Sequence, residues 1–115
     1  MSRAQRDRGA RGELEIVRLL QDRGWPARRG FASGGGAGLG GDIEGGPPGW
    51  TWEVKRTNRL QLYAALDQAL AAAAPGERPV VASRRDGDPW LAHLHLADLL
   101  DLIDPPTNHD HRRQP

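Results

Sequence analysis

The segment from residue 41 to residue 55 constrains the fold of this chain more than any other. It reads Gly41-Asp42-Ile43-Glu44-Gly45, then Gly46-Pro47-Pro48-Gly49, then Trp50-Thr51-Trp52-Glu53-Val54-Lys55. Proline and glycine suit a turn and interrupt a strand. The segment therefore predicts two short strands joined as a hairpin.

The second predicted strand places an acid beside a base. Side chains alternate along a strand, so Glu53 and Lys55 project from the same face, about 7 Å apart. Pairing across the hairpin brings Asp42 close to Glu53. Two converging carboxylates form a site for a hard cation such as Mg²⁺. A lysine beside that site stabilises developing negative charge or activates an attacking water.

The presence of the chain's single lysine in this segment distinguishes it from an ordinary surface hairpin. The alternative interpretation is a solvated Glu53–Lys55 pair, because an Asp-x(10)-Glu-x-Lys pattern also arises by chance. Of the sixteen basic residues, however, fifteen are arginine and only Lys55 is lysine. Arginine cannot replace lysine where chemistry requires a compact ammonium with a tunable pKa. We therefore interpret Asp42, Glu53 and Lys55 as catalytic residues.

The N-terminal segment predicts a helix over residues 2–23 that carries an acid on its apolar side. Ile16, Val17 and Leu20 define an apolar stripe, and Glu13 falls on the same stripe. An acid that faces inward implies a metal or a basic partner. The alternative is an acid of the first turn that the helix dipole favours.

The rest of the chain predicts further strands and helices of one α/β domain. With the segments above, the order is α-β-β-β-α-β-β-α, a small mixed β-sheet with flanking helices. We expect a single domain over residues 1–103 and a disordered tail over residues 104–115. The additional elements are strand 27–32, helix 60–74 with Leu62, Leu66, Ala69, Leu70 and Ala73 on its packing face, strand 79–83, strand 89–94 and helix 96–103.

Residues 34–41 are nearly all glycine and contain the spacing Gly36-x-Gly38-x-x-Gly41. This spacing is also that of a dinucleotide-binding loop, which requires a helix directly after it. Here a predicted strand follows, so we interpret the segment as a mobile loop.

Composition and charge narrow the class of protein. The chain has no cysteine, which excludes a disulfide framework and a thiolate metal site. No apolar run approaches membrane length, and we expect a soluble, cytoplasmic protein. Residues 1–35 hold eight arginines against four acids, and Lys55, Arg56 and Arg59 form a second basic cluster. A basic face around an acidic pocket suits a phosphodiester substrate. The alternative is an ordinary solvated surface.

These motifs resemble those of the PD-(D/E)xK nuclease superfamily, and within it the archaeal-type and phage-borne Holliday junction resolvases. Asp42 with Glu53-x-Lys55 matches the metal-binding and catalytic motif, and Gly9-Ala10-x-Gly12-Glu13-Leu14-Glu15 is similar to the first helix of the family. Gly41 replaces the proline of the motif, and Leu14 stands where archaeal members often carry a basic residue. The resemblance covers about residues 9–103 and implies a restriction-endonuclease-like core.

The resemblance also implies a role for each residue of the motif. Asp42 and Glu53, with the backbone carbonyl of Val54, would bind Mg²⁺, or Mn²⁺ in its place. Glu13 would join the site directly or through water, and Lys55 would orient or activate the attacking water. Arg29 and Ser33 would hold the scissile phosphate, and Gln68 matches a polar helix residue of the superfamily. The basic clusters add Arg11, Arg56 and Arg59 as candidate DNA contacts.

The predicted function is a Mg²⁺-dependent endonuclease that resolves four-way (Holliday) junctions in DNA. Such a junction has two strands to cut symmetrically, which favours a homodimer with two active sites. The apolar faces of Trp50, Trp52 and Trp90 are candidates for the dimer surface, unless they pack in the core. Three alternatives remain: another nuclease of the superfamily acting on linear, nicked or flapped DNA, a non-catalytic DNA-binding module, and a nucleotide-binding protein that uses the glycine loop.

Overall fold

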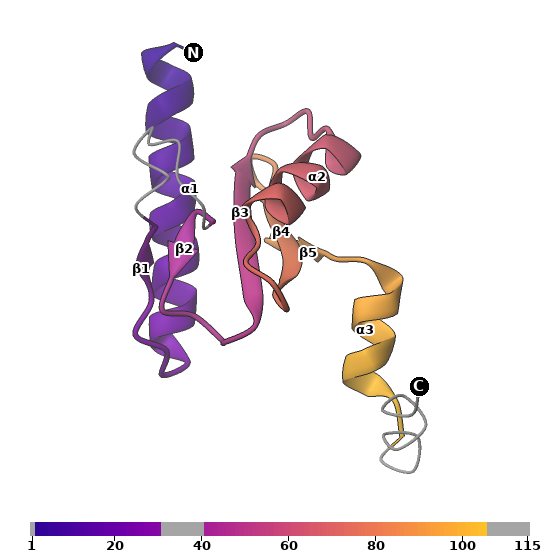
Figure 1. Cartoon of the computed structure of the whole chain (residues 1–115). Helices are drawn as coiled ribbons and strands as arrows, with labels where there is room; N and C mark the ends of the chain where they lie inside the picture. Colours follow the sequence, from indigo (N-terminus) through magenta and orange to yellow (C-terminus); the bar gives the residue numbers. More distant parts are fainter. Residues whose placement is uncertain (1, 31–40, 106–115) are drawn as a thin grey trace.

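The computed structural model describes residues 2–30 and 41–105. Its elements follow the predicted order, with a mixed sheet between helices (Figure 1). The predicted α/β class is therefore confirmed. The elements are α1 (Arg3–Asp22), β1 (Arg28–Arg29), β2 (Ile43–Glu44), β3 (Trp50–Arg56), α2 (Leu62–Ala72), β4 (Arg78–Arg84), β5 (Leu91–His93) and α3 (Leu96–Ile103).

The first helix runs without a break through two glycines. Its start is fixed by a capping box, in which Gln5 N donates to Ser2 Oγ and Ser2 N donates to Gln5 Oε1. Gly12 lies where α1 crosses β3, and a Cβ added there would approach Arg56 Cβ to 3.0 Å. The glycine that weakens the helix locally therefore allows the helix to dock closely against the sheet.

The central sheet has the strand order β3-β4-β5, with β3 and β4 parallel and β4 and β5 antiparallel. Helix α2 makes the crossover between the two parallel strands. In their register, Glu53 is opposite Val81 and Lys55 is opposite Ser83. Lys55 and Glu53 thus belong to a strand that is held along its full length by β4.

The predicted hairpin is wrong in its pairing. Strand β2 pairs with β1, not with β3, and its link to β3 is a 2.7 Å bond from Asp42 N to Trp52 O. Both residues of β2 pair with β1, in the register Arg28 with Glu44 and Arg29 with Ile43, so that only Asp42, just before β2, bonds to β3.

The first predicted strand is also shorter than expected. Strand β1 holds only Arg28 and Arg29, and residues 31–40 lie outside the described part of the chain. The predictions for the glycine-rich loop and for most of the C-terminal tail, residues 106–115, fall outside it as well.

Two apolar clusters hold the helices to the sheet. The smaller one packs Ala65 and Leu66 of α2 against Val81, which is completely buried. The prediction for α2 was right for Leu66 but wrong for Leu70, which is 51 % exposed. The buried residues of α2 are Ala65, Leu66 and Ala69, so the stripe that packs on the sheet excludes Leu70. The larger cluster comprises Ile16, Val17, Ala27, Ile43, Val54 and Ala82, with Leu20, Trp52 and Trp90 packed against it.

Helix α3 forms where the amphipathic pattern predicted it, but none of its residues is buried. Figure 1 shows it at the C-terminal end, standing away from the central sheet. In residues 2–30 and 41–105, no helix is both long and apolar enough to span a membrane.

Candidate active site

The structure brings together the three acids that the sequence singled out. Glu13 comes from α1, Glu53 from β3, and Asp42 directly precedes β2. Both glutamates are buried, with 6 % of each residue exposed. The charge of Asp42 raises the pKa of both glutamates, so its carboxylate lies close to each of them. Three elements far apart in the sequence therefore meet at one acidic cluster.

Asp42 is fixed to the strand that carries Glu53. Its Oδ2 accepts a 2.7 Å hydrogen bond from Val54 N, and its own N donates to Trp52 O at 2.7 Å. The backbone on both sides of Glu53 thus binds Asp42. The sequence predicted the proximity of Asp42 and Glu53 from pairing across a hairpin, whereas the structure achieves it through these two hydrogen bonds.

Arg29 reaches the cluster from β1. Its Nε and Nη2 donate to Glu13 Oε1 at 3.0 and 2.8 Å, and 38 % of its side chain remains exposed. The neighbouring Arg28 points elsewhere and pairs with Glu44 at 3.0 Å. Alternation along a strand predicts that at most one of two adjacent arginines faces the site, and Arg29 is the one that does.

Lys55 supplies the second cation of the site. Its Nζ lies 3.4 Å from Glu53 Oε1, and one third of its side chain is exposed. The two side chains emerge from the same face of β3, as the spacing of two predicts. A lysine in this position is open to a substrate on its exposed side and to the acids on its buried side.

Burial and mutual repulsion disturb the titration of both glutamates. The pKa of Glu53 is raised from 4.5 to about 7, chiefly by burial and then by the charge of Asp42, against the attraction of Lys55. Burial also raises the pKa of Glu13, and the hydrogen bond from Arg29 opposes this shift. Both glutamates are therefore harder to ionise in this site than they would be in water.

The acidic cluster has the donor set of a hard-cation site. The carboxylates of Glu13, Asp42 and Glu53 offer only oxygen, which Mg²⁺ and Mn²⁺ prefer, and the Val54 carbonyl as a further ligand stays a prediction. The raised pKa values point the same way, because a bound cation relieves the repulsion among the acids. The described residues contain no ready-made group of three metal-binding side chains. In this conformation the carboxylates are instead occupied by Arg29, Lys55 and the Val54 amide.

The remaining predicted DNA contacts occupy different environments. Arg56 has only 19 % of its side chain exposed and lies 3.1 Å from Glu15 and 3.7 Å from Asp86. Arg84 also pairs with Glu15, so Glu15 ties α1 to the ends of β3 and β4. Arg11 on α1, Arg59 after β3 and Gln68 on α2 are exposed, and Ser33 lies outside the described residues.

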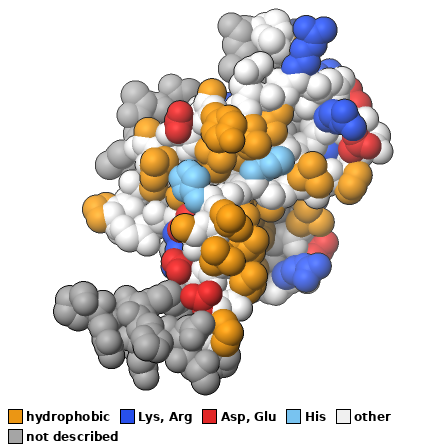
Figure 2. Space-filling model, turned by 90° about the vertical axis from the view of Figure 1, so that its right-hand side faces the viewer, with side chains coloured by type: hydrophobic (Ala, Val, Ile, Leu, Met, Phe, Trp, Pro, Cys, Tyr) orange, Lys and Arg blue, Asp and Glu red, His pale blue; other side chains and the backbone are white. Residues whose placement is uncertain are grey.

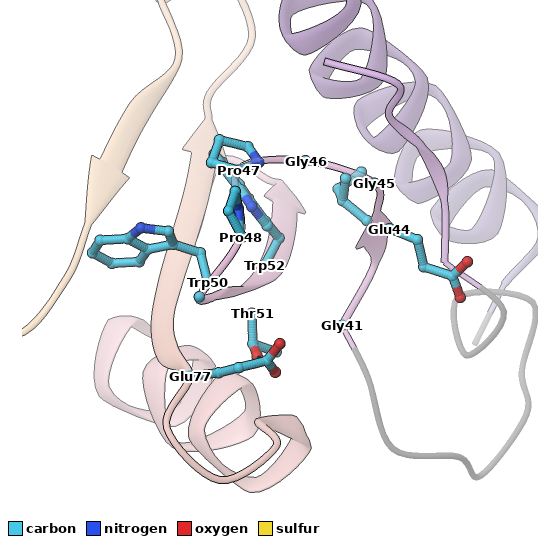
Figure 3. A pocket seen from close by; sticks show the side chains of 12 residues that line it. Gly41, Glu44, Gly45, Gly46, Pro47, Pro48, Trp50, Thr51, Trp52 and Glu77 are labelled. Carbon is cyan, nitrogen blue, oxygen red and sulfur yellow. The ribbon is translucent and has the colours of Figure 1, made fainter.

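A pocket of about 300 Å³ lies at the start of β3, and no residue of the acidic cluster lines it (Figure 3). It is lined by Gly41 and Trp52, the residues that precede Asp42 and Glu53, and by the turn 45–49. Figure 3 shows Glu77 beside Thr51 at this pocket, where Thr51 Oγ1 donates to Glu77 Oε1 at 2.7 Å. That hydrogen bond, with one from Ala74 N, lowers the pKa of Glu77. Sequence reasoning missed Glu77, which lies 24 residues beyond Glu53 across the α2 crossover.

Comparison with known proteins identifies the fold. No family model matches the chain, and no curated protein matches its sequence. Among solved structures, it is similar to the 1.6 Å structure of Archaeoglobus fulgidus Hjc, a Holliday junction resolvase from an archaeal hyperthermophile. The TM-score is 0.54 at 23 % identity, over 73 % of this chain and 73 % of that chain. The two chains share a fold. The predicted restriction-endonuclease-like core is thereby confirmed, and so is the likeness to a resolvase at the level of the fold.

Proposed function

We propose that this chain is a divalent-metal-dependent endonuclease that cuts branched DNA, with four-way junctions as its substrate and a homodimer as its working form. One observation carries the proposal: Glu13, Asp42 and Glu53 converge beside Lys55 in a resolvase-like fold. A purely structural cluster would gain nothing from holding two glutamates whose pKa values burial and the charge of Asp42 raise.

The chemistry is hydrolysis of a phosphodiester. A water oxygen attacks phosphorus, the bond to the 3′-oxygen breaks, and the products are a 3′-hydroxyl and a 5′-phosphate. The proton of the attacking water leaves to a base, and the departing 3′-oxygen takes up a proton. The carboxylates of Glu13, Asp42 and Glu53, with the Val54 carbonyl, would hold a divalent cation, which would supply Lewis-acid stabilisation of the phosphate charge.

The side chains of the site divide the remaining tasks. Lys55 orients the attacking water and stabilises the charge that develops on the phosphate. Arg29, with 38 % of its side chain exposed, holds a phosphate oxygen while it keeps Glu13 in place. Asp42 keeps β2 against β3, so that the acids from both segments face the same point.

The test is cleavage of an immobile four-way junction in Mg²⁺, beside a linear duplex made of the same arms. We expect paired symmetric nicks in the junction that an excess of linear competitor does not suppress. Mn²⁺ should replace Mg²⁺. Equal cutting of the linear duplex would contradict the junction substrate and leave an endonuclease of the same fold. Tight junction binding without any cutting would contradict the enzyme and favour a DNA-binding module.

The test variant is Glu53→Gln, and its matched control is Asp67→Asn. Each substitution removes one carboxylate charge. Glu53 is buried in the cluster, whereas Asp67 is exposed on α2. Only Glu53→Gln should abolish cleavage, and junction binding should remain nearly intact in both variants.

A further inference from the structure

Helix α3 is oriented with its polar side toward its own chain. Asp98 lies 3.5 Å from Arg78 Nε, and Asp101 lies 3.3 Å from Arg78 Nη2, at the start of β4. In a helix packed on its own domain, the charged side normally faces water and the apolar side faces the core. Here the ion pairs with Arg78 attach the acidic side of α3 to the body.

The apolar side of α3 is consequently turned outward. Leu96, Leu99, Leu100 and Ile103 follow the spacing i, i+3, i+4 and i+7, which places them on one stripe opposite the two acids. With Leu102, their exposed fractions run from 38 to 67 %. A stripe of this kind in water requires a partner.

The exposed surface continues onto the edge of the sheet. Leu91 on the edge strand β5 is 57 % exposed. Figure 2 shows hydrophobic side chains gathered along the face that carries β5 and α3, with histidine side chains between them. Leu91 and the five exposed apolar residues of α3 thus add large apolar side chains to one face of the molecule, and large exposed apolar patches mark interaction sites.

The charges of α3 identify the kind of partner. Its only charged side chains are Asp98 and Asp101, whereas a helix that lies on an anionic membrane carries lysine or arginine on its polar side. DNA is excluded by the same absence of cations, because phosphate contacts dominate its binding. An outward face without charge does not repel an identical face, and two such faces can pair about a two-fold axis.

We infer that the α3 stripe and Leu91 form the interface between two copies of this chain. The inference rests on the proposed function in one respect, namely that two symmetric cuts call for two active sites related by a two-fold axis. It replaces two earlier candidates for the dimer surface, Trp52 and Trp90, since both pack against the core. The interface lies on β5 and α3, so it leaves the acidic cluster of α1, β2 and β3 accessible to DNA.

Sedimentation velocity of the full chain over a wide range of concentration tests this inference. The variant Leu100→Glu places a charge on the stripe and should weaken dimerisation by more than about 100-fold, because an unpaired charge resists burial. The folded monomer should persist, since no residue of α3 is buried. Leu19→Glu is the matched control: Leu19 on α1 is 48 % exposed, Leu100 is 45 % exposed, and the control should stay dimeric.

A cysteine cross-link gives a second measurement. The natural chain has no cysteine, so Leu100→Cys introduces one thiol that can couple only to its copy in the partner. A bifunctional maleimide should link this variant into dimers and leave Leu19→Cys unlinked. A monomeric wild-type chain, or a Leu100→Glu variant that remains dimeric, would overturn the inference.

Cleavage assays separate this inference from the proposed function. If the Leu100→Glu variant remains a dimer and still nicks junctions, the proposed interface is refuted and the proposed nuclease is not. Absence of cutting by the wild-type chain would refute the nuclease, while sedimentation still reports on the interface. If both proposals hold, Leu100→Glu retains metal-dependent nicking but loses the paired second cut.

Discussion

Replacing Glu53 by glutamine should make the metal-free protein more stable at alkaline pH. Glu53 has a pKa near 7 in the folded chain and about 4.5 in the unfolded chain. A carboxyl whose folded pKa is raised contributes stability that is present below pH 4.5 and is lost as pH rises to 7. Glutamine has no proton to lose, so Glu53→Gln avoids this loss.

The magnitude follows from the difference between the two pKa values. One pKa unit corresponds to 1.36 kcal/mol, so ionising Glu53 costs the folded state about 3 kcal/mol. This pKa already includes the attraction of Lys55. The advantage of Glu53→Gln over the wild-type chain should therefore grow by about 3 kcal/mol between pH 4 and pH 8.

Urea unfolding in EDTA, followed by circular dichroism at both pH values, measures this difference. Comparing the variant with the wild-type chain cancels the titration of other groups that the substitution leaves unchanged. Adding Mg²⁺ at pH 8 should stabilise the wild-type chain and have little effect on the variant. A Glu53→Gln variant that is less stable than the wild-type chain at pH 8 would refute the account of Glu53 as a strained, buried acid.

Three further substitutions probe other parts of the account. Lys55→Arg should lower the cleavage rate by at least about 100-fold and retain junction binding, because a guanidinium cannot replace a compact ammonium. Single-turnover assays measure the cleavage rate, with Arg59→Lys as the control variant. Normal cutting by Lys55→Arg would contradict the role of Lys55. Gly12→Ala should cost about 1–2 kcal/mol in urea unfolding, because its Cβ meets Arg56 Cβ at 3.0 Å; Gly9→Ala, with nothing within 4 Å, should be neutral or stabilising. Arg78→Gln should release the acids of α3 and raise proteolysis between β5 and α3, with Arg85→Gln as the unaffected control.

Local periodicity predicted those parts of the site that depend on a single element. The period of two placed Glu53 beside Lys55, and the period of 3.6 placed Glu13 on the buried side of α1. These relations hold within one strand or one helix, so no knowledge of tertiary packing is required to state them.

The sequence did not predict the contacts between different helices and strands. The hydrogen bond from Val54 N to Asp42 joins segments that lie twelve residues apart, and no periodicity within one element reveals it. The partner of Arg29 depends on how β1 docks on α1. The ion pairs of Glu15 with Arg56 and Arg84 likewise depend on how α1 docks at the ends of β3 and β4.

The orientation of α3 illustrates the same limit. Its apolar stripe is evident from the spacing of its leucines, and that pattern alone predicts a helix with its stripe facing inward. The ion pairs with Arg78, 20 residues before Asp98, reverse this orientation. A sequence pattern fixes which side of a helix is apolar, whereas the contacts of the polar side decide where the apolar side points.

The most direct test of the central claim is whether the acidic cluster supports metal-dependent hydrolysis of DNA. Wild-type chain and Glu53→Gln are incubated with a mixture of four-way junction, nicked, flapped and linear DNA, in Mg²⁺ or in EDTA. We predict cutting only by the wild-type chain in Mg²⁺, with 5′-phosphate ends on the products. Cutting that persists in EDTA or in Glu53→Gln, or its absence on every substrate, would contradict a nuclease site at Glu13, Asp42, Glu53 and Lys55.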